Sequence, residues 1–226
     1  MNDYLLPLIE LYNEAANSEN AGPMEKYMRH QFEFLGIKSP ERKRLFREFV
    51  QQQGLPDLAD LDKICRDLWH LPEREYQYSA MDLLERMRRK LTPDFIPLLE
   101  YLIITKSWWD TIDGLASHSV GDLFKKYPDI RDEHIDRWRV SDNFWLRRIT
   151  LLFQLRYKHE TDEALLFDLI LENVDSEEFF IQKAIGWALR EYSKTNATAV
   201  TTFVNNHTLP RLSQREALKW LKKQQT

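Results

Sequence analysis

The segment Asn143-Phe144-Trp145-Leu146-Arg147-Arg148-Ile149 has counterparts along the whole chain. When the apolar segments are aligned, Trp145 shares a column with Tyr76, Trp108 and Phe180, and subtraction gives spacings of 32, 37 and 35 residues. A weak period in this range, with two helical stretches per unit, is typical of a HEAT-like helical-repeat solenoid. We therefore predict an all-α fold, an α-α superhelix with a concave surface, formed by residues 1–226 as a single repeat domain.

Proline marks several of the expected helix boundaries. Thr92-Pro93 opens a helical segment that ends near Thr105, and Tyr127-Pro128 ends one helix and starts the next. Pro23 is expected to start a further helix, which would carry Tyr27. No segment shows the alternation expected of a strand.

Composition indicates a soluble and largely helical protein. The 226 residues are 43% hydrophobic and 30% charged, with only six glycines. No apolar run approaches the roughly 20 residues that span a bilayer, and the first residues lack the features of a signal peptide, so we expect a cytoplasmic protein with no membrane partner. The single cysteine, Cys65, excludes an internal disulfide and is expected to be buried as a small apolar residue.

The charge distribution is uneven. A formal net charge of −4 argues weakly against binding of nucleic acid through the overall field. A local basic face is still possible, and charges gathered at helix ends are the alternative. The final segment contains Glu216 as its one acid against five cations: Arg211, Arg215, Lys219, Lys222 and Lys223.

A tryptophan and a carboxylate lie one helical turn apart in Lys106-Ser107-Trp108-Trp109-Asp110-Thr111-Ile112-Asp113. In a helix, Trp109 and Asp113 at i and i+4 are stacked beside a core stripe that contains Trp108 and Ile112. A large ring beside an acid suits contact with something flat, sugar-like or cationic. The alternative is an interrupted core helix with a solvated aspartate.

A second unusual aromatic residue lies in the predicted helix from Phe179 to Lys194. Lys183, Trp187, Arg190 and Lys194 recur on one face of this helix, apart from its apolar stripe. Cations beside a ring are suited to a phosphate backbone and its sugars. Packing of the ring on the next repeat, under the lysine stems, explains the pattern equally well.

Successive repeats of a solenoid bring equivalent positions together on its concave surface. Asp113, Arg148 and a residue near 183 to 187 could form a site in this way. Arg148 borders the apolar stripe of its helix, so it either reaches a phosphate or stacks on Trp145. Tyr27 alone carries almost no signal.

Several other chemistries have no support in the sequence. The six histidines form no pair at i, i+3 or i+4, so no helix presents a two-histidine metal site. A phosphate-binding glycine loop and a Gly-x-Ser-x-Gly nucleophile elbow are also missing. We expect neither a metal nor an organic cofactor.

Read together, these residues resemble the AlkD family of bacterial alkylpurine DNA glycosylases, over nearly the whole chain. The individual patterns are modest, but their order and spacing are specific. They are Gly22-Pro23-Met24-Glu25-Lys26-Tyr27-Met28, Phe32-Glu33-Phe34-Leu35-Gly36-Ile37, Leu71-Pro72-Glu73-Arg74-Glu75, Thr105-Lys106-Ser107-Trp108-Trp109-Asp110, Ser141-Asp142-Asn143 and Phe179-Phe180-Ile181-Gln182-Lys183-Ala184-Ile185-Gly186-Trp187.

The resemblance implies a HEAT-like solenoid that wraps duplex DNA. It further implies hydrolysis of the N-glycosidic bond of cationic N3- and N7-alkylpurines such as 3-methyladenine and 7-methylguanine, without the base flipping that other such enzymes use. By the same resemblance Asp113 is the catalytic carboxylate, Trp109 and Trp187 lie against the deoxyribose, Arg148 contacts the DNA backbone and Tyr27 lies near the DNA. The cations Lys183, Arg190 and Lys194 are candidates for DNA binding.

The alternative function is a non-catalytic helical-repeat module that binds DNA or a protein through the same surface. Asp113 distinguishes the two, because a carboxylate in a groove that only binds phosphates would weaken binding by repulsion. A monomer is expected, since a curved chain that encloses a duplex needs no partner subunit, and it would be associated with the nucleoid when bound to DNA.

Overall fold

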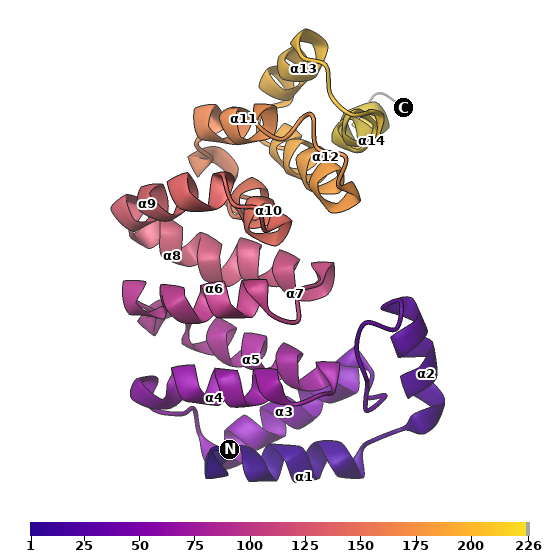
Figure 1. The fold of residues 1–226 in the computed structure, drawn as a ribbon, viewed down its shortest axis with the longest axis vertical. Helices are drawn as coiled ribbons and strands as arrows, with labels where there is room; N and C mark the ends of the chain where they lie inside the picture. The colour runs from indigo at the N-terminus through magenta and orange to yellow at the C-terminus, as the bar shows by residue number, and fades with distance from the viewer. Residues whose placement is uncertain (225–226) are drawn as a thin grey trace. The chain divides into compact units, whose positions relative to one another are not determined.

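The computed structural model describes residues 1–224 and is built from α-helices joined by turns and loops (Figure 1). Within these residues no strand forms, and the one β-bridge is an isolated pairing of Glu33 with Glu73. The predicted all-α class is confirmed. The α-helices are α1 (Leu6–Glu14), α2 (Ser18–Tyr27), α3 (Ser39–Gln53), α4 (Leu58–His70), α5 (Arg74–Met87), α6 (Ile96–Ile104), α7 (Trp109–Gly114), α8 (Gly121–Lys126), α9 (Pro128–Arg139), α10 (Phe144–Leu152), α11 (Glu163–Leu171), α12 (Phe179–Ser193), α13 (Ala197–Asn206), α14 (Arg211–Ala217) and α15 (Lys219–Gln224).

The chain packs into two compact units, Met1–Leu98 and Leu99–Thr226. Short 3-10 helices, η1 (Asp3–Leu5), η2 (Arg88–Lys90), η3 (Pro93–Phe95) and η5 (Lys158–Glu160), lie beside the main helices, and η4 (Leu115–Val120) is a π-helix. No helix within residues 1–224 is long and apolar enough to cross a membrane.

The first unit encloses its own apolar core between α1, α3, α4 and α5. Helix α1 packs on α3, and α4 packs on α5. Cys65 on α4 is fully buried, as predicted, with its sulfur 3.9 Å from the carbonyl oxygen of Ala80 on α5. Its surroundings are apolar, and burial raises the pKa of the thiol, which keeps it in the neutral form.

Helix α2 buries none of its residues, and a neighbouring loop holds it in place. Asn17 caps the helix through its side chain, so the helix begins before Pro23 and the expected start at that proline is wrong. The amide of Asn17 donates to Leu35 in the loop, and Gly36 has a φ of 85° there. A Cβ atom at Gly36 would overlap the carbonyl oxygen of Asn17, so only glycine fits this close approach.

A buried carboxylate fixes the same loop. Glu75 on α5 is fully buried and accepts backbone hydrogen bonds from Leu35, Gly36 and Ile37 at 3.1, 3.0 and 3.1 Å. These bonds satisfy an acid that burial would otherwise penalise. The loop around residues 35–37, which contacts the start of α2, is therefore anchored to the core of the first unit.

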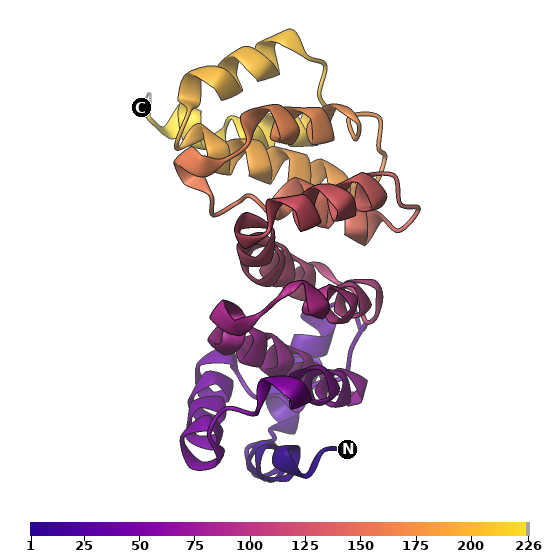
Figure 2. The same cartoon turned by 90° about the vertical axis from the view of Figure 1, so that its left-hand side faces the viewer.

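Helix α6 begins at the end of the first unit, and in the second unit the helices from α7 to α13 stack in chain order (Figures 1 and 2). Helix α7 continues through the π-helix η4 into α8 as one helical run. Helix α12 packs on α10, α13 and α14. The proline starts predicted at Pro93 and Pro128 are confirmed by η3, which leads into α6, and by α9.

Three members of the aromatic column that predicted the repeat form a physical cluster in this unit, whereas the fourth, Tyr76, lies in the first unit beside Tyr12. Trp108 caps α7, and Trp145 and Phe180 lie in the first turns of α10 and α12. Their ring centroids are 6.1 Å apart for Trp108 and Trp145, 5.0 Å for Trp145 and Phe180, and 5.1 Å for Trp108 and Phe180. Equivalent positions of successive repeats therefore become neighbours, and the first turns of α7, α10 and α12 lie together.

Candidate active site

Helix α7 presents Trp109 and Asp113 on one side. A turn at Lys106, whose φ is 47°, precedes the helix, and the extended backbone of Trp108 starts it. Thr111 and Ile112 point into the core and are fully buried, whereas Trp109 and Asp113 are half-buried. The π-helix that follows is a form often found at functional sites.

Arg148 binds one oxygen of Asp113. Its Nε and Nη2 lie 2.9 and 2.8 Å from Oδ1, and its Nη1 donates to the carbonyl oxygen of Phe180. Within residues 1–224, Oδ2 accepts no hydrogen bond, and the Asp113 side chain is 17% exposed. The carboxylate is thus fixed through one oxygen and has the other available.

The pKa of Asp113 is raised above the ordinary value for an aspartate. Burial is the main cause, because it disfavours the charged form, and the positive charge of Arg148 opposes it. Asp110 contributes a smaller repulsion. The group remains an acid whose ionised form is costly in this site, which is common among functional carboxylates.

A pocket of about 230 Å³ opens beside this ion pair. Its walls come from α7, α10, α12 and α14, all in the second unit. Phe179 is 53% exposed and lies edge-on to Phe180, with ring centroids 5.4 Å apart. The residues that line the pocket are Trp109, Asp113, Arg148, Phe179, Phe180, Lys183, Trp187, Arg190 and Glu216.

Glu216 holds the cations on the α12 side of this pocket. Its side chain is 4% exposed and lies 3.3 Å from Lys183, 2.9 Å from Arg190 and 2.6 Å from Lys219. Burial opposes ionisation of this carboxyl, but the hydrogen bonds and charges of Lys219 and Lys183 outweigh it, so its pKa is lowered. Glu216 is therefore a carboxylate that three cations share.

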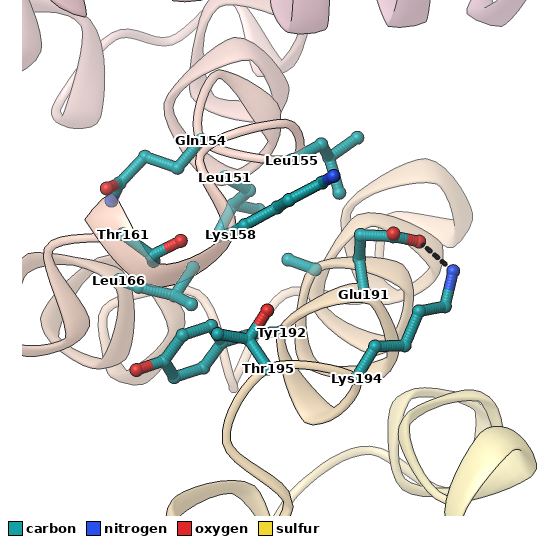
Figure 3. Close-up of a pocket in the computed structure, with 11 residues that line it drawn as sticks. Leu151, Gln154, Leu155, Lys158, Thr161, Leu166, Glu191, Tyr192, Lys194 and Thr195 are labelled. Atoms are coloured by element: carbon teal, nitrogen blue, oxygen red, sulfur yellow. Dashed lines mark hydrogen bonds and ion pairs between the residues drawn. The ribbon is translucent and has the colours of Figure 1, made fainter.

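The structure brings most of the expected site residues together and leaves two elsewhere. Tyr27 lies on α2 in the first unit and is 70% exposed. Lys194 caps the end of α12, pairs with Glu191 at 2.6 Å and lines a different cavity of about 300 Å³, which Figure 3 shows. Five expected residues share the pocket with the catalytic candidate Asp113: Trp109, Arg148, Lys183, Trp187 and Arg190.

Phe179 and Glu216 also line the pocket, although neither was among the predicted site residues. Phe179 is adjacent to the repeat position Phe180, which marks it only as a neighbour. Glu216 carried a weak signal, as the lone acid in a basic segment. Within residues 1–224, no three acidic, histidine or cysteine side chains are grouped so that they could hold a metal ion.

The chain is similar to known proteins over most of its length. The sequence profile of a family described as DNA alkylation repair enzyme matches residues 8–221. The chain belongs to this family. The family expected from the sequence resemblance is therefore confirmed, and with it a DNA-repair enzyme that has DNA as its partner.

A solved structure supports membership of the DNA alkylation repair enzyme family. The chain is similar to a "Predicted DNA alkylation repair enzyme from Enterococcus faecalis", with a TM-score of 0.85 and 35% sequence identity. The similarity covers 92% of this chain and 97% of that one. No curated protein matches the chain.

Proposed function

We propose that this member of the family is a monofunctional DNA glycosylase. It hydrolyses the N-glycosidic bond of cationic N3- and N7-alkylpurines in duplex DNA, without flipping the damaged base out of the helix. The observation that carries the proposal is the Asp113 carboxylate, which Arg148 fixes through Oδ1 while Oδ2 is available in a pocket lined by Trp109 and Trp187. The protein acts as a monomer in the cytoplasm, associated with the nucleoid when bound to DNA.

The chemistry of the substrate suits a site with one carboxylate. A cationic N-alkylpurine leaves as a neutral base when the C1′–N bond breaks and its electron pair moves to the base. Little general acid is needed, and the requirement is to stabilise the oxocarbenium-like sugar and to orient water. Oδ2 of Asp113 would do both, and the proton of the attacking water would pass to this carboxylate and then to solvent.

Electrostatics should dominate the rate enhancement. A carboxylate about 4 Å from the developing charge, at an effective dielectric constant near 20, contributes about 4 kcal/mol, which corresponds to about a thousandfold in rate. Each tryptophan face beside the sugar adds about 0.5 to 2 kcal/mol by cation–π interaction. Asp113→Asn should therefore lose more activity than either Trp109→Ala or Trp187→Ala.

Arg148 has a different proposed role from the backbone contact that the resemblance implies. Its guanidinium is buried, and Nε, Nη1 and Nη2 already engage Asp113 or Phe180. We assign it the positioning of Asp113. Contact with the phosphates is left to Lys183 and Arg190, whose side chains are 36% and 29% exposed.

The test is release of free base from duplex DNA that carries N7-methylguanine, in a buffer with a metal chelator. We expect wild type to release the base and Asp113→Asn to lose nearly all of this activity. Asp142→Asn is the matched control, because Asp142 is exposed and does not line the pocket, so it should act like wild type. No release by wild type, together with salt-sensitive duplex binding, would instead favour the non-catalytic DNA-binding module.

A further inference from the structure

Helix α14 places one carboxylate at a fixed point beside α12. Gly186 on α12 allows the two helices to approach closely, since a Cβ atom there would lie 2.5 Å from the Cβ of Glu216 and 2.8 Å from the carbonyl oxygen of Ser213. The Ser213 hydroxyl also donates to the carbonyl oxygen of Gln182 at 2.8 Å. The close packing of α14 on α12 therefore fixes the backbone position of Glu216.

Three cations converge on this carboxylate from the solvent side. Oε1 accepts from Lys183 and Lys219, and Oε2 accepts from Arg190. The Glu216 side chain is 4% exposed, whereas those of Lys183, Arg190 and Lys219 are 36%, 29% and 52% exposed. An ammonium has three donors and a guanidinium has five, so donors remain that point away from the acid.

The cluster has an excess of positive charge at a defined place. Three cations and one carboxylate leave a formal charge of +2. Lys183 and Arg190 flank Trp187 at i−4 and i+3 on α12, and both line the pocket that contains Asp113. An anion bound to the cluster would thus lie next to whatever occupies the pocket.

We propose that Lys183, Arg190 and Lys219, arranged by the buried Glu216, form a binding site for one phosphate of the DNA backbone beside the nucleotide held at Trp187. The inference rests on the proposed function for the identity of that nucleotide. Glu216 acts as a positioning residue, because it offsets the mutual repulsion of the three cations and holds them in one geometry before DNA arrives. Lys219 becomes a phosphate ligand from the C-terminal helix.

The first experiment measures binding of undamaged duplex DNA as a function of salt, so it does not depend on glycosylase activity. We expect Lys219→Gln to weaken binding several-fold at moderate salt and to reduce the magnitude of the slope of log K against log salt by up to about 0.9. Lys223→Gln removes an exposed lysine from the same helix and should leave affinity and slope nearly unchanged. Equal behaviour of the two variants would overturn the phosphate site, even if Asp113→Asn abolishes base release.

The second experiment tests the positioning role of Glu216 with Glu216→Gln, which keeps the shape and removes the charge. We expect the single-turnover rate of base release at saturating DNA to fall about tenfold while low-salt affinity for DNA does not fall, because the cluster gains positive charge. An unchanged rate would overturn the positioning role. If the variant fails to fold, the comparison of Lys219→Gln with Lys223→Gln still decides the phosphate site.

Discussion

The two oxygens of Asp113 have different surroundings, and the proposed reaction uses that difference. Oδ1 is bound by Arg148, and Oδ2 is available to the pocket. Burial raises the pKa of the whole carboxyl, so its ionised form requires a higher pH than an ordinary aspartate does. Activity that needs the carboxylate must then decline as the pH falls through this raised pKa.

The first prediction is therefore an acid limb in the pH profile of base release. The single-turnover rate of wild type should fall with decreasing pH, with a midpoint above the ordinary aspartate value of about 3.9. Asp113→Asn should have a low rate with no such limb. The measurement is the rate of 7-methylguanine release between about pH 4 and 8, corrected for release without protein, and an acid limb of equal midpoint in the variant would contradict it.

The second prediction concerns stability. A carboxyl whose pKa is raised on folding stabilises the protein below its unfolded pKa, and this contribution is lost as the pH rises through the folded pKa. At pH 7, ionised Asp113 should therefore not add to stability. We expect the Tm of Asp113→Asn to equal or exceed that of wild type in thermal unfolding at pH 7, and a Tm several degrees lower would show that the ion pair with Arg148 stabilises the fold.

The third prediction separates positioning from DNA binding at Arg148. Arg148→Ala leaves Asp113 without its partner, so the rate at saturating DNA should fall by at least tenfold and the acid limb should move to higher pH. Arg147→Ala is the matched control, because Arg147 donates to the carbonyl oxygen of Ser141 and does not contact Asp113. A loss of affinity with an unchanged rate would instead support the backbone contact.

At the scale of elements, helical periodicity explains which parts of the site could be predicted from the sequence. Trp109 and Asp113 share α7, and Lys183, Trp187 and Arg190 share α12, so a period of 3.6 residues was sufficient to group each set. Lys194 is on the same face as Lys183, but 11 residues at about 1.5 Å each place it about 16 Å further along the axis. Helical periodicity predicts which face of the helix a residue occupies, but it does not predict how far along the helix the pocket extends.

The remaining residues depend on contacts between helices. Glu216 meets Lys183 only because α14 packs on α12, and no repeat of the sequence predicts that docking. The partners of Arg148 are on α7 and α12, so its buried role also required the positions of three helices. The aromatic column was predictable because it repeats, whereas these ion pairs occur once.

The fourth prediction tests the docking of α14 on α12. Gly186→Ala places a Cβ atom 2.5 Å from that of Glu216, so the helices must separate, and we expect a loss of roughly 1 to 3 kcal/mol in the free energy of unfolding. Gly22→Ala is the control, since nothing lies within 4 Å of its added Cβ and alanine favours α2 by up to about 1 kcal/mol. Denaturant unfolding measures both, and equal effects of the two changes would contradict the close packing.

At the scale of the whole molecule, the family match extends over both compact units, from residue 8 to residue 221. The candidate pocket belongs to the second unit alone. A net charge of −4 does not favour attraction of DNA through the overall field, so we expect binding to come from local surfaces. The first unit would contribute through Tyr27, which is 70% exposed on α2. The buried carboxylate of Glu75 fixes the loop that lies beside this helix.

The fifth prediction tests whether the first unit contributes to DNA binding. Tyr27→Ala should weaken binding of duplex DNA by several-fold, because it removes an exposed ring that can pack on the backbone. The rate of base release at saturating DNA should stay within about twofold of wild type, since Asp113 and its pocket are in the other unit. Tyr4→Phe is the control and should leave DNA affinity nearly unchanged, because the Tyr4 hydroxyl donates to the carbonyl oxygen of Gly54 within the first unit. If Tyr27→Ala lowers the rate and leaves affinity unchanged, Tyr27 acts in the chemistry and the division of tasks between the units is wrong.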